Sequence, residues 1–257
     1  MYQATDRDNE TTMSIEDQRF IQIMESNIHK NQTGHWEMPL PLRSNDIHVP
    51  DNRDQASTRL KNLLHSFKRN PMEQDYFNFM AKLFECGHAV PIPIEATPPK
   101  ETGKIWYLPH FGVYHPRKPN KIQVVFDSSA EFKGTSLNKE LLSGPDMHNG
   151  LQGNTGQIQK KCQQMFHNFH VHPPHRDPLR FLWFADNVKE KDIIVYQMVV
   201  HLFGNMSSPA VATFGLRKTA EEGEKEFGQD AKDFVVEDFY VDDGLTSHDT
   251  AEGTVSH

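Results

Sequence analysis

The order in which two hydrophobic patterns follow each other along the chain constrains its fold most. Apolar residues recur at the spacing of amphipathic helices in residues 14–28, 54–69 and 76–86. Runs rich in β-branched and aromatic residues come next, and helical spacing returns from Ser207 to about Phe227. Strands that do not alternate regularly with helices do not build a parallel βαβ sheet, so the sequence predicts an α+β fold.

Local signals set the expected limits of the first elements. Ser14 is a suitable N-cap for the first helix, and Gly34 ends that segment. Asp54 begins the second helix, and Gly87 is suited to the position that follows the third. Residues 35–52 are interrupted by prolines, which predicts an edge strand followed by a loop.

Two pairs of strands are expected in the middle of the chain. Residues 104–108 (KIWYL) and 121–126 (KIQVVF) form the first pair, with the turn at Pro119-Asn120. Residues 179–184 and 193–200 form the second pair. A short helix around residues 230–236 then leads into a brief strand at residues 239–241.

Composition limits the class of protein. Hydrophobic residues make up 36% of the 257 residues, enough for an ordinary core, and no run approaches the roughly 18 apolar residues of a membrane span. Residues 1–13 are polar and acidic, so we expect a disordered tail there and no secretory signal. Two cysteines cannot build a disulfide framework, which favours an intracellular setting.

The net charge lies in the last part of the chain. From Arg217 onward there are four basic and twelve acidic residues, a charge of -8 that equals the net charge of the whole protein. Proteins that bind nucleic acids usually carry a basic face, and composition alone shows none here. It neither proves nor excludes such binding, and we interpret the acidic stretch as a solvated helix surface.

The strongest chemical signal is the sequence FYVDDG. Asp242 and Asp243 stand at the tip of a predicted hairpin whose turn is residues 242–244 and whose second strand is Leu245-Thr246. Adjacent carboxylates repel each other unless a cation lies between them, and a pair of Mg²⁺ ions would satisfy this requirement. Two such ions can stabilise both oxygens of a phosphoryl transfer. Taken alone, an Asp-Asp-Gly tripeptide is more often a plain β-turn.

Longer blocks add a family resemblance. FYVDDGLTS resembles the YxDD hairpin of reverse transcriptases. Four further blocks resemble the polymerase region of BEL/Pao retrotransposons, in the same order, from about residue 14 to the end of the chain. These blocks are GHWEMPLPLR, KIWYLPHFGVYHPRKPNKIQVVFDSSAEFKGTSLNKELLSGPDM, QMFHNFHVHPPHRDPLRFLWF and VHLFGNMSSPAVATFGLRKTA. The resemblance implies a right-hand polymerase, with fingers at about residues 14–145 and a palm at about residues 146–257.

The resemblance assigns roles to individual residues. Asp242 and Asp243 match the Mg²⁺-binding pair, of which the first is the direct ligand. Phe203, Gly204 and Pro209 match the loop and helix start that cover the template–primer and the incoming nucleotide. A glycine lets the backbone approach a base pair closely, and proline suits the first turn of a helix.

Further matches lie in the fingers. Leu137-Asn138 and Gly144-Pro145 match a segment that packs near the template strand, and Asp127 matches a structural acid at the end of a strand.

Two departures from the family pattern imply a defective centre. Gln123 stands where the family has an arginine that contacts the triphosphate; Lys121 is nearby and could cover part of that role. Lys161 stands where the family has its other metal-binding aspartate, and no Asp or Glu occurs between Asp146 and Asp177. A lysine at this place would repel Mg²⁺ instead of bridging two ions.

Other candidate sites are weaker. His167, His170, His172 and His175 have the spacing HxxHxHxxH, which could indicate zinc, but Pro173-Pro174 interrupts the segment and no acid or cysteine completes a known ligand spacing.

Aromatic residues and a cysteine leave further alternatives. Trp106, Tyr107, Phe111 and Tyr114 could stack on bases, or equally form a buried face of a β-hairpin. Cys86 is expected to be a core residue rather than a nucleophile.

The expected protein is therefore a truncated reverse transcriptase-like domain without a thumb. By resemblance, it is an RNA-directed DNA polymerase whose partners are an RNA or DNA template–primer and deoxynucleoside triphosphates. Its metal site is expected to be inactive, and no membrane contact is expected. A non-catalytic module that binds nucleic acid or protein, and a retroelement remnant without function, remain alternatives.

Overall fold

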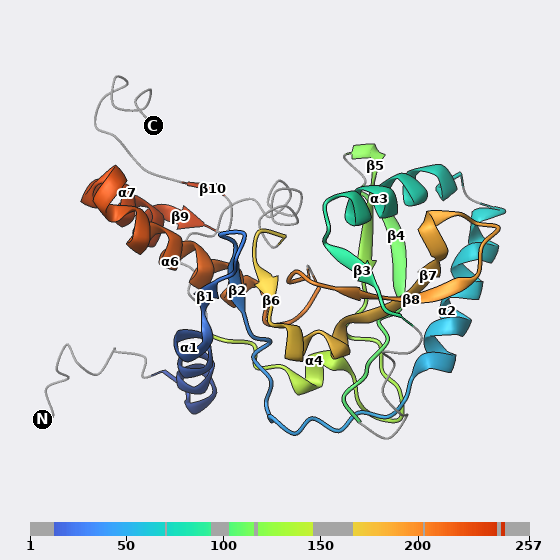
Figure 1. The fold of residues 1–257 in the computed structure, drawn as a ribbon, viewed down its shortest axis with the longest axis horizontal. Helices are drawn as coiled ribbons and strands as arrows, with labels where there is room; N and C mark the ends of the chain where they lie inside the picture. The colour runs from blue at the N-terminus through green and yellow to red at the C-terminus, as the bar shows by residue number, and fades with distance from the viewer. Residues whose placement is uncertain are drawn as a thin grey trace, which may run out of the picture.

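The structure is a computed structural model, and it describes residues 13–69, 71–93, 103–115, 118–145, 167–202, 204–240 and 243–244. It is a mixed α+β fold, as expected (Figure 1). The helices are α1 (Ile15–Asn27), α2 (Arg53–Phe67), α3 (Glu73–Glu85), α4 (Leu137–Glu140), α6 (Ser208–Phe227) and α7 (Gln229–Asp233). The strands are β1 (His29–Lys30), β2 (Trp36–Met38), β3 (Ala89–Pro91), β4 (His110–His115), β5 (Lys118–Phe126), β6 (His170–Val171), β7 (Arg180–Phe184), β8 (Ile193–Met198), β9 (Phe239–Tyr240) and β10 (Asp243–Gly244).

The first three helices form where the sequence predicts them. Ser14 caps α1 by accepting a hydrogen bond at its hydroxyl from the backbone N of Asp17, at 3.1 Å. Burial of Phe20 and Met24 then holds this helix against the rest of the protein. The apolar stripes of α2 and α3 are buried in the same way, and Gly87 follows α3 with a positive φ of 68°, as the C-terminal signal predicts.

The predicted pairing of the strands after residue 178 is confirmed. β7 and β8 are antiparallel, and β3 pairs with the other edge of β8, which gives the order β3-β8-β7. Every residue of β7 is buried, and helix α2 packs on this strand. β4 and β5 form a separate two-stranded hairpin, against which α3 also packs.

A small sheet joins distant parts of the chain. β2 lies in its centre, antiparallel to β1 and parallel to β6, and so the expectation that residues 35–52 hold an edge strand is wrong. Gly34, with φ +83°, lies in the turn between β1 and β2 rather than at the end of α1. The partner on the second edge is a segment far along the chain, which no local pattern reveals.

Residues 104–108 are not a strand. Tyr107 makes only an isolated bridge, to Arg180. The side chain of Asn52 takes both backbone groups of Tyr107: its Nδ2 donates to the carbonyl at 2.8 Å, and its Oδ1 accepts from the N–H at 2.8 Å. These groups are then unavailable to a neighbouring strand, so the buried, β-rich segment remains an extended loop.

The first hairpin is also shifted from its predicted register. β4 begins at His110, and Pro119 and Asn120 lie inside β5 rather than in the turn. A proline is tolerated here because β5 belongs to a two-stranded hairpin, in which both strands are edges. Cys86 is exposed at the end of α3, so its assignment to the core is wrong.

The described residues form two hydrophobic cores. The larger one lies among α2, α3 and strands β3, β4, β5, β7 and β8. The smaller one joins α1 to α6 and includes Phe20, Met24, Phe169, Val211 and Phe214. Figure 1 shows α1 and α6 on one side of the molecule and α2 and α3 on the other. No helix among the described residues has the length and apolar character needed to span a membrane.

The C-terminal region follows its predicted outline. α6 begins with its N-cap at Ser207 and ends at Phe227. α7 leads into a π-helical turn, Phe234–Asp238, and then into β9. Residues 153–161 lie outside the described residues.

Candidate functional site

The predicted hairpin at FYVDDG is present, but Asp243 and Gly244 pair with β9 instead of lying in the turn. β9 and β10 are antiparallel, and Asp243 lies opposite Tyr240 while Gly244 lies opposite Phe239. Asp243 therefore belongs to the second strand rather than to the turn. Asp242 and the expected return strand Leu245-Thr246 lie outside the described residues.

This hairpin lies against the C-terminal helices. Both β9 and β10 contact the π-helical turn at Phe234–Asp238, which in turn contacts α6. Figure 1 shows β9 and β10 beside α6, well away from β4 and β5. The structure therefore does not bring Asp243 to Gln123, which lies on β5 opposite Val113 and is half-buried.

Three motif segments that are far apart in the sequence do meet, in what we call the loop junction. It consists of the end of β5 with residues 126–128, the start of α4 at residues 137–138, and residues 204–209, which are the loop before α6 and the start of that helix. Asn138 joins two of them: its Nδ2 donates to the carbonyl of Gly204 at 3.4 Å, and its Oδ1 accepts from the backbone N of Met206 at 2.9 Å.

Gly204 is required at this junction. Its φ is +114°, a conformation that side chains other than hydrogen rarely adopt. A Cβ atom there would lie 3.0 Å from the carbonyl oxygen of Phe126, so the loop could not approach β5 as closely with another residue. The close approach expected at Gly204 is therefore made to the protein's own backbone in this structure.

A buried hydrogen bond locks the junction. The hydroxyl of Ser128 donates to Oδ1 of Asn205 at 2.5 Å, and both side chains are buried. The backbone N of Asn138 donates to the carbonyl of Ser128 at 2.9 Å. Asp127 accepts from the backbone N and the hydroxyl of Ser129, at 3.1 and 2.7 Å, which agrees with a structural acid at the end of a strand.

The remaining predicted residues are divided between exposed and undescribed positions. Pro209 is exposed in the first turn of α6, where proline is favoured. Lys121 lies on β5, and only its backbone is described. Phe203 and Lys161 lie outside the described residues.

The aromatic residues near the first hairpin divide between core and surface. Trp106 and Tyr107 are buried in the larger core, which excludes them as a surface for stacking bases. Tyr114 is partly buried and donates its hydroxyl to Asp75 at 2.7 Å. Phe111 is 42% exposed on β4 and remains available to a ligand.

Sequence reasoning missed one cluster of ligand-type side chains. His29, Glu37 and His172 each offer a ligand atom, and these atoms lie within 4.8 Å of one another. The histidine-rich segment alone indicated no acidic zinc ligand, because Glu37 lies on β2, far from that segment in the sequence. The pairing of β1, β2 and β6 brings these residues together, so only the long-range sheet register reveals them.

Burial controls the charge of the surrounding histidines. It lowers the pKa of His172, with a smaller contribution from the neighbouring His29. It also lowers the pKa of His170 and His175, and it lowers the pKa of His201 to about 3. The lowered pKa favours the neutral imidazole in these histidines, and this is the form that can bind a metal ion.

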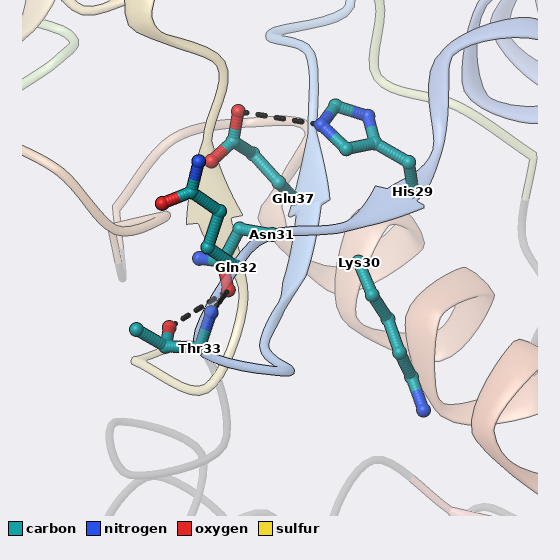
Figure 2. Close-up of a pocket in the computed structure, with 6 residues that line it drawn as sticks. All are labelled: His29, Lys30, Asn31, Gln32, Thr33 and Glu37. Atoms are coloured by element: carbon teal, nitrogen blue, oxygen red, sulfur yellow. Dashed lines mark hydrogen bonds and ion pairs between the residues drawn. The ribbon is translucent and has the colours of Figure 1, made fainter.

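An open pocket adjoins His29 and Glu37. It has a volume of about 410 Å³ and is lined by His29, Lys30, Asn31, Gln32, Thr33 and Glu37. Figure 2 shows the carboxylate of Glu37 directed toward the ring of His29, while Lys30 points away from both. Asn31 shapes the turn by accepting hydrogen bonds at Oδ1 from the backbone N and hydroxyl of Thr33, at 3.0 and 2.8 Å.

Comparison with known proteins gives no family assignment: no protein-family model matches the chain, and no curated protein matches it.

Proposed function

We propose that this protein is the fingers and palm region of a BEL/Pao-like reverse transcriptase whose two-metal centre is defective. The observation that carries the proposal is the loop junction. Segments 126–128, 137–138 and 204–209 resemble three separate motifs of that polymerase region, and direct hydrogen bonds join them in this structure. The hairpin with Asp243 opposite Tyr240 adds support, because the YxDD motif of the family is also a hairpin.

The junction has the features needed to contact a nucleic acid backbone. Gly204, Met206 and Pro209 are exposed, while Asn205 and Ser208 are buried and hold the loop in place. In the family that the sequence resembles, the matching loop and helix start cover the template–primer and the incoming nucleotide. A rigid loop with an exposed glycine can approach a nucleotide without losing much conformational entropy on binding.

The proposed defect follows from charge. A two-metal phosphoryl transfer needs carboxylates that bind both ions. By the family resemblance, Lys161 stands where one of these carboxylates would be. At about 4 Å and an effective dielectric constant of about 20, one pair of unit charges contributes roughly 4 kcal/mol. Replacing a negative by a positive charge beside a divalent ion changes several such interactions, so Mg²⁺ binding is strongly opposed. The separation of β9 and β10 from Gln123 on β5 also favours an inactive centre.

A primer-extension assay tests the polymerase proposal. Purified protein is incubated with a primed RNA template, deoxynucleoside triphosphates and Mg²⁺, beside an Asp242→Asn variant and an active reverse transcriptase. We expect no incorporation above that of the Asp242→Asn variant, since phosphoryl transfer depends almost entirely on positioning and charge neutralisation. Incorporation that requires both the template and Asp242 would show that the centre is active.

Binding is measured in the same experiment, because an inactive polymerase domain can still bind nucleic acid. Phe111 and Val113 are 42% and 39% exposed at alternate positions of β4, and therefore lie on one face of the hairpin. This face favours a binding module as the second candidate function, with bases stacked on Phe111. Phe111→Ser should then weaken the binding of a fluorescent single-stranded RNA, whereas Ile193→Ser, at a similarly exposed position on β8, should not. Absence of RNA binding at low salt would contradict both candidates.

A further inference from the structure

We infer that His29, Glu37 and His172 form a binding site for a divalent transition metal ion of the zinc type. The three side chains come from β1, β2 and the residue after β6, and the sheet register brings them together. Two imidazoles and one carboxylate are a ligand set that zinc uses in proteins, with the fourth position open to water. The inference is independent of the polymerase proposal, whose metal-binding pair is Asp242 and Asp243.

The hydrogen bonding of His29 leaves an electron lone pair directed at a carboxylate. Its Nδ1 lies 3.3 Å from the backbone carbonyl of Asn27, to which it can only donate, so the proton of the neutral ring is on Nδ1. Nε2 then carries a lone pair and lies 3.6 Å from Oε1 of Glu37. Two acceptors at this distance repel each other unless a proton or a cation lies between them. A metal ion at this place would be bound by both.

The distances are close to those of a tetrahedral site. Ligand atoms at about 2.0–2.1 Å from a zinc ion are roughly 3.3 Å from one another in tetrahedral geometry. The separation of 3.6 Å between His29 Nε2 and Glu37 Oε1 is near this value, and small side-chain rotations would bring in a third ligand from within 4.8 Å. The hydrogen bond of His29 to Asn27 also orients its ring, which is how the outer shell of metal sites usually fixes a histidine ligand.

Glu37 and His172 show the burial expected of ligands. Glu37 is a buried carboxylate whose other oxygen, Oε2, lies 3.8 Å from Nη2 of Arg176. This arginine orients the carboxylate and leaves Oε1 for the metal. Nε2 of His172 is buried and has no hydrogen-bond partner among the residues that the structure describes. An unpaired buried nitrogen costs free energy, and a metal ion would remove that cost.

Neighbouring groups define the limits of the site. Nδ1 of His175 accepts a hydrogen bond from the backbone N of Leu40 at 3.1 Å, which keeps that nitrogen out of the ligand set. Lys30 points away from His29 and Glu37 (Figure 2), and it forms an ion pair with Glu222. The pocket that His29 and Glu37 line lets water reach the fourth coordination position. Imidazole ligands favour zinc and similar ions over Mg²⁺ and Ca²⁺.

Zinc titration of the untagged protein tests the inference. Isothermal titration calorimetry at pH 7.5 should give one Zn²⁺ per chain with a Kd of about 1 µM or tighter. His29→Ala should weaken binding at least 10-fold, because loss of an outer-shell partner alone costs roughly 10–100-fold at such sites. His29 is exposed, so this variant should still fold. His65→Ala, at an exposed position on α2, and Asp242→Asn should change the Kd less than about twofold.

A second readout identifies the ligands. Co²⁺ bound to the protein should give the strong visible absorption of a tetrahedral site, and His172→Gln and Glu37→Gln should each abolish it. Circular dichroism checks that these variants remain folded. If His172→Gln or Glu37→Gln is unfolded, the test relies on His29→Ala instead. Binding that is unchanged in His29→Ala, or the absence of saturable 1:1 Zn²⁺ binding in the unmodified chain, would overturn the inference. Loss of Zn²⁺ binding in Asp242→Asn would instead place the ion at the FYVDDG hairpin and also overturn it.

Discussion

Replacement of Gly144 by alanine tests the contact between the segment after α4 and the smaller core. Gly144 has a φ of +79°, and a Cβ atom added there would lie 2.6 Å from Cβ of Ala210 and 2.8 Å from Cε2 of Phe20. Both neighbours are buried, in α6 and α1 respectively. Real Cβ atoms do not come this close to other carbon atoms, so the surrounding helices would have to move.

Gly34 provides a matched control. Its φ is +83°, almost the same as that of Gly144, but a Cβ atom there would meet nothing within 4 Å. Alanine at a positive φ costs roughly 1–2 kcal/mol, of which about 0.4–1 kcal/mol is offset by the lower entropy of the unfolded chain. We therefore expect Gly34→Ala to lower the free energy of unfolding by about 1 kcal/mol.

Gly144→Ala should cost more because overpacking adds to the same backbone strain. Overpacking a core typically costs 1–3 kcal/mol, which gives a total of about 2–4 kcal/mol. Urea denaturation followed by circular dichroism measures the two variants against the unmodified protein, and the slope with denaturant should stay constant. If the two substitutions differ by less than about 0.5 kcal/mol, residue 144 does not pack between α1 and α6 as described.

Two further predictions concern buried polar groups. Nε2 of His110 donates to the carbonyl of Leu182, so its Nδ1 accepts from the hydroxyl of Tyr76 at 2.5 Å. Tyr76→Phe should therefore lower the free energy of unfolding by about 1–3 kcal/mol, measured by urea denaturation. An unchanged free energy of unfolding would contradict this hydrogen bond. Burial lowers the pKa of His110 to about 4 and that of His201 to about 3, from 6.5, so the unfolded chain binds more protons below pH 6.5. The free energy of unfolding should be nearly constant from pH 7 to 8 and should fall from pH 6.5 to pH 4. His110 and His201 together contribute up to about 3 kcal/mol per pH unit to this fall; a constant free energy of unfolding down to pH 5 would refute the prediction.

The sequence predicted the elements whose signals are local. Ser14 and Ser207 were expected helix starts, and both are N-caps in the structure. β7 and β8 were found because a continuous apolar run and a short connection are sufficient to specify an antiparallel pair. The FYVDDG hairpin was also found, since its two strands are neighbours in the sequence.

The failures have long-range causes. Residues 104–108 have the composition of a strand, but the side chain of Asn52 occupies the backbone groups that a strand would need. β2 was expected at an edge because nothing in its neighbourhood indicates a parallel partner at His170. Glu37 was missed as a candidate ligand for the same reason: its role depends on the pairing that brings His172 near it.

The smaller core has a consequence for how the chain can fold during synthesis. Helix α1 buries Phe20 and Met24 against residues of α6, such as Val211, which the ribosome makes much later. Until that helix emerges, the apolar face of α1 has no native partner and must be exposed or bound by a chaperone. The larger core also includes residues that are synthesised late, such as Val200 and Leu202, which lie shortly before α6 in the sequence. Cotranslational folding should therefore be delayed until nearly all the described residues have left the exit tunnel.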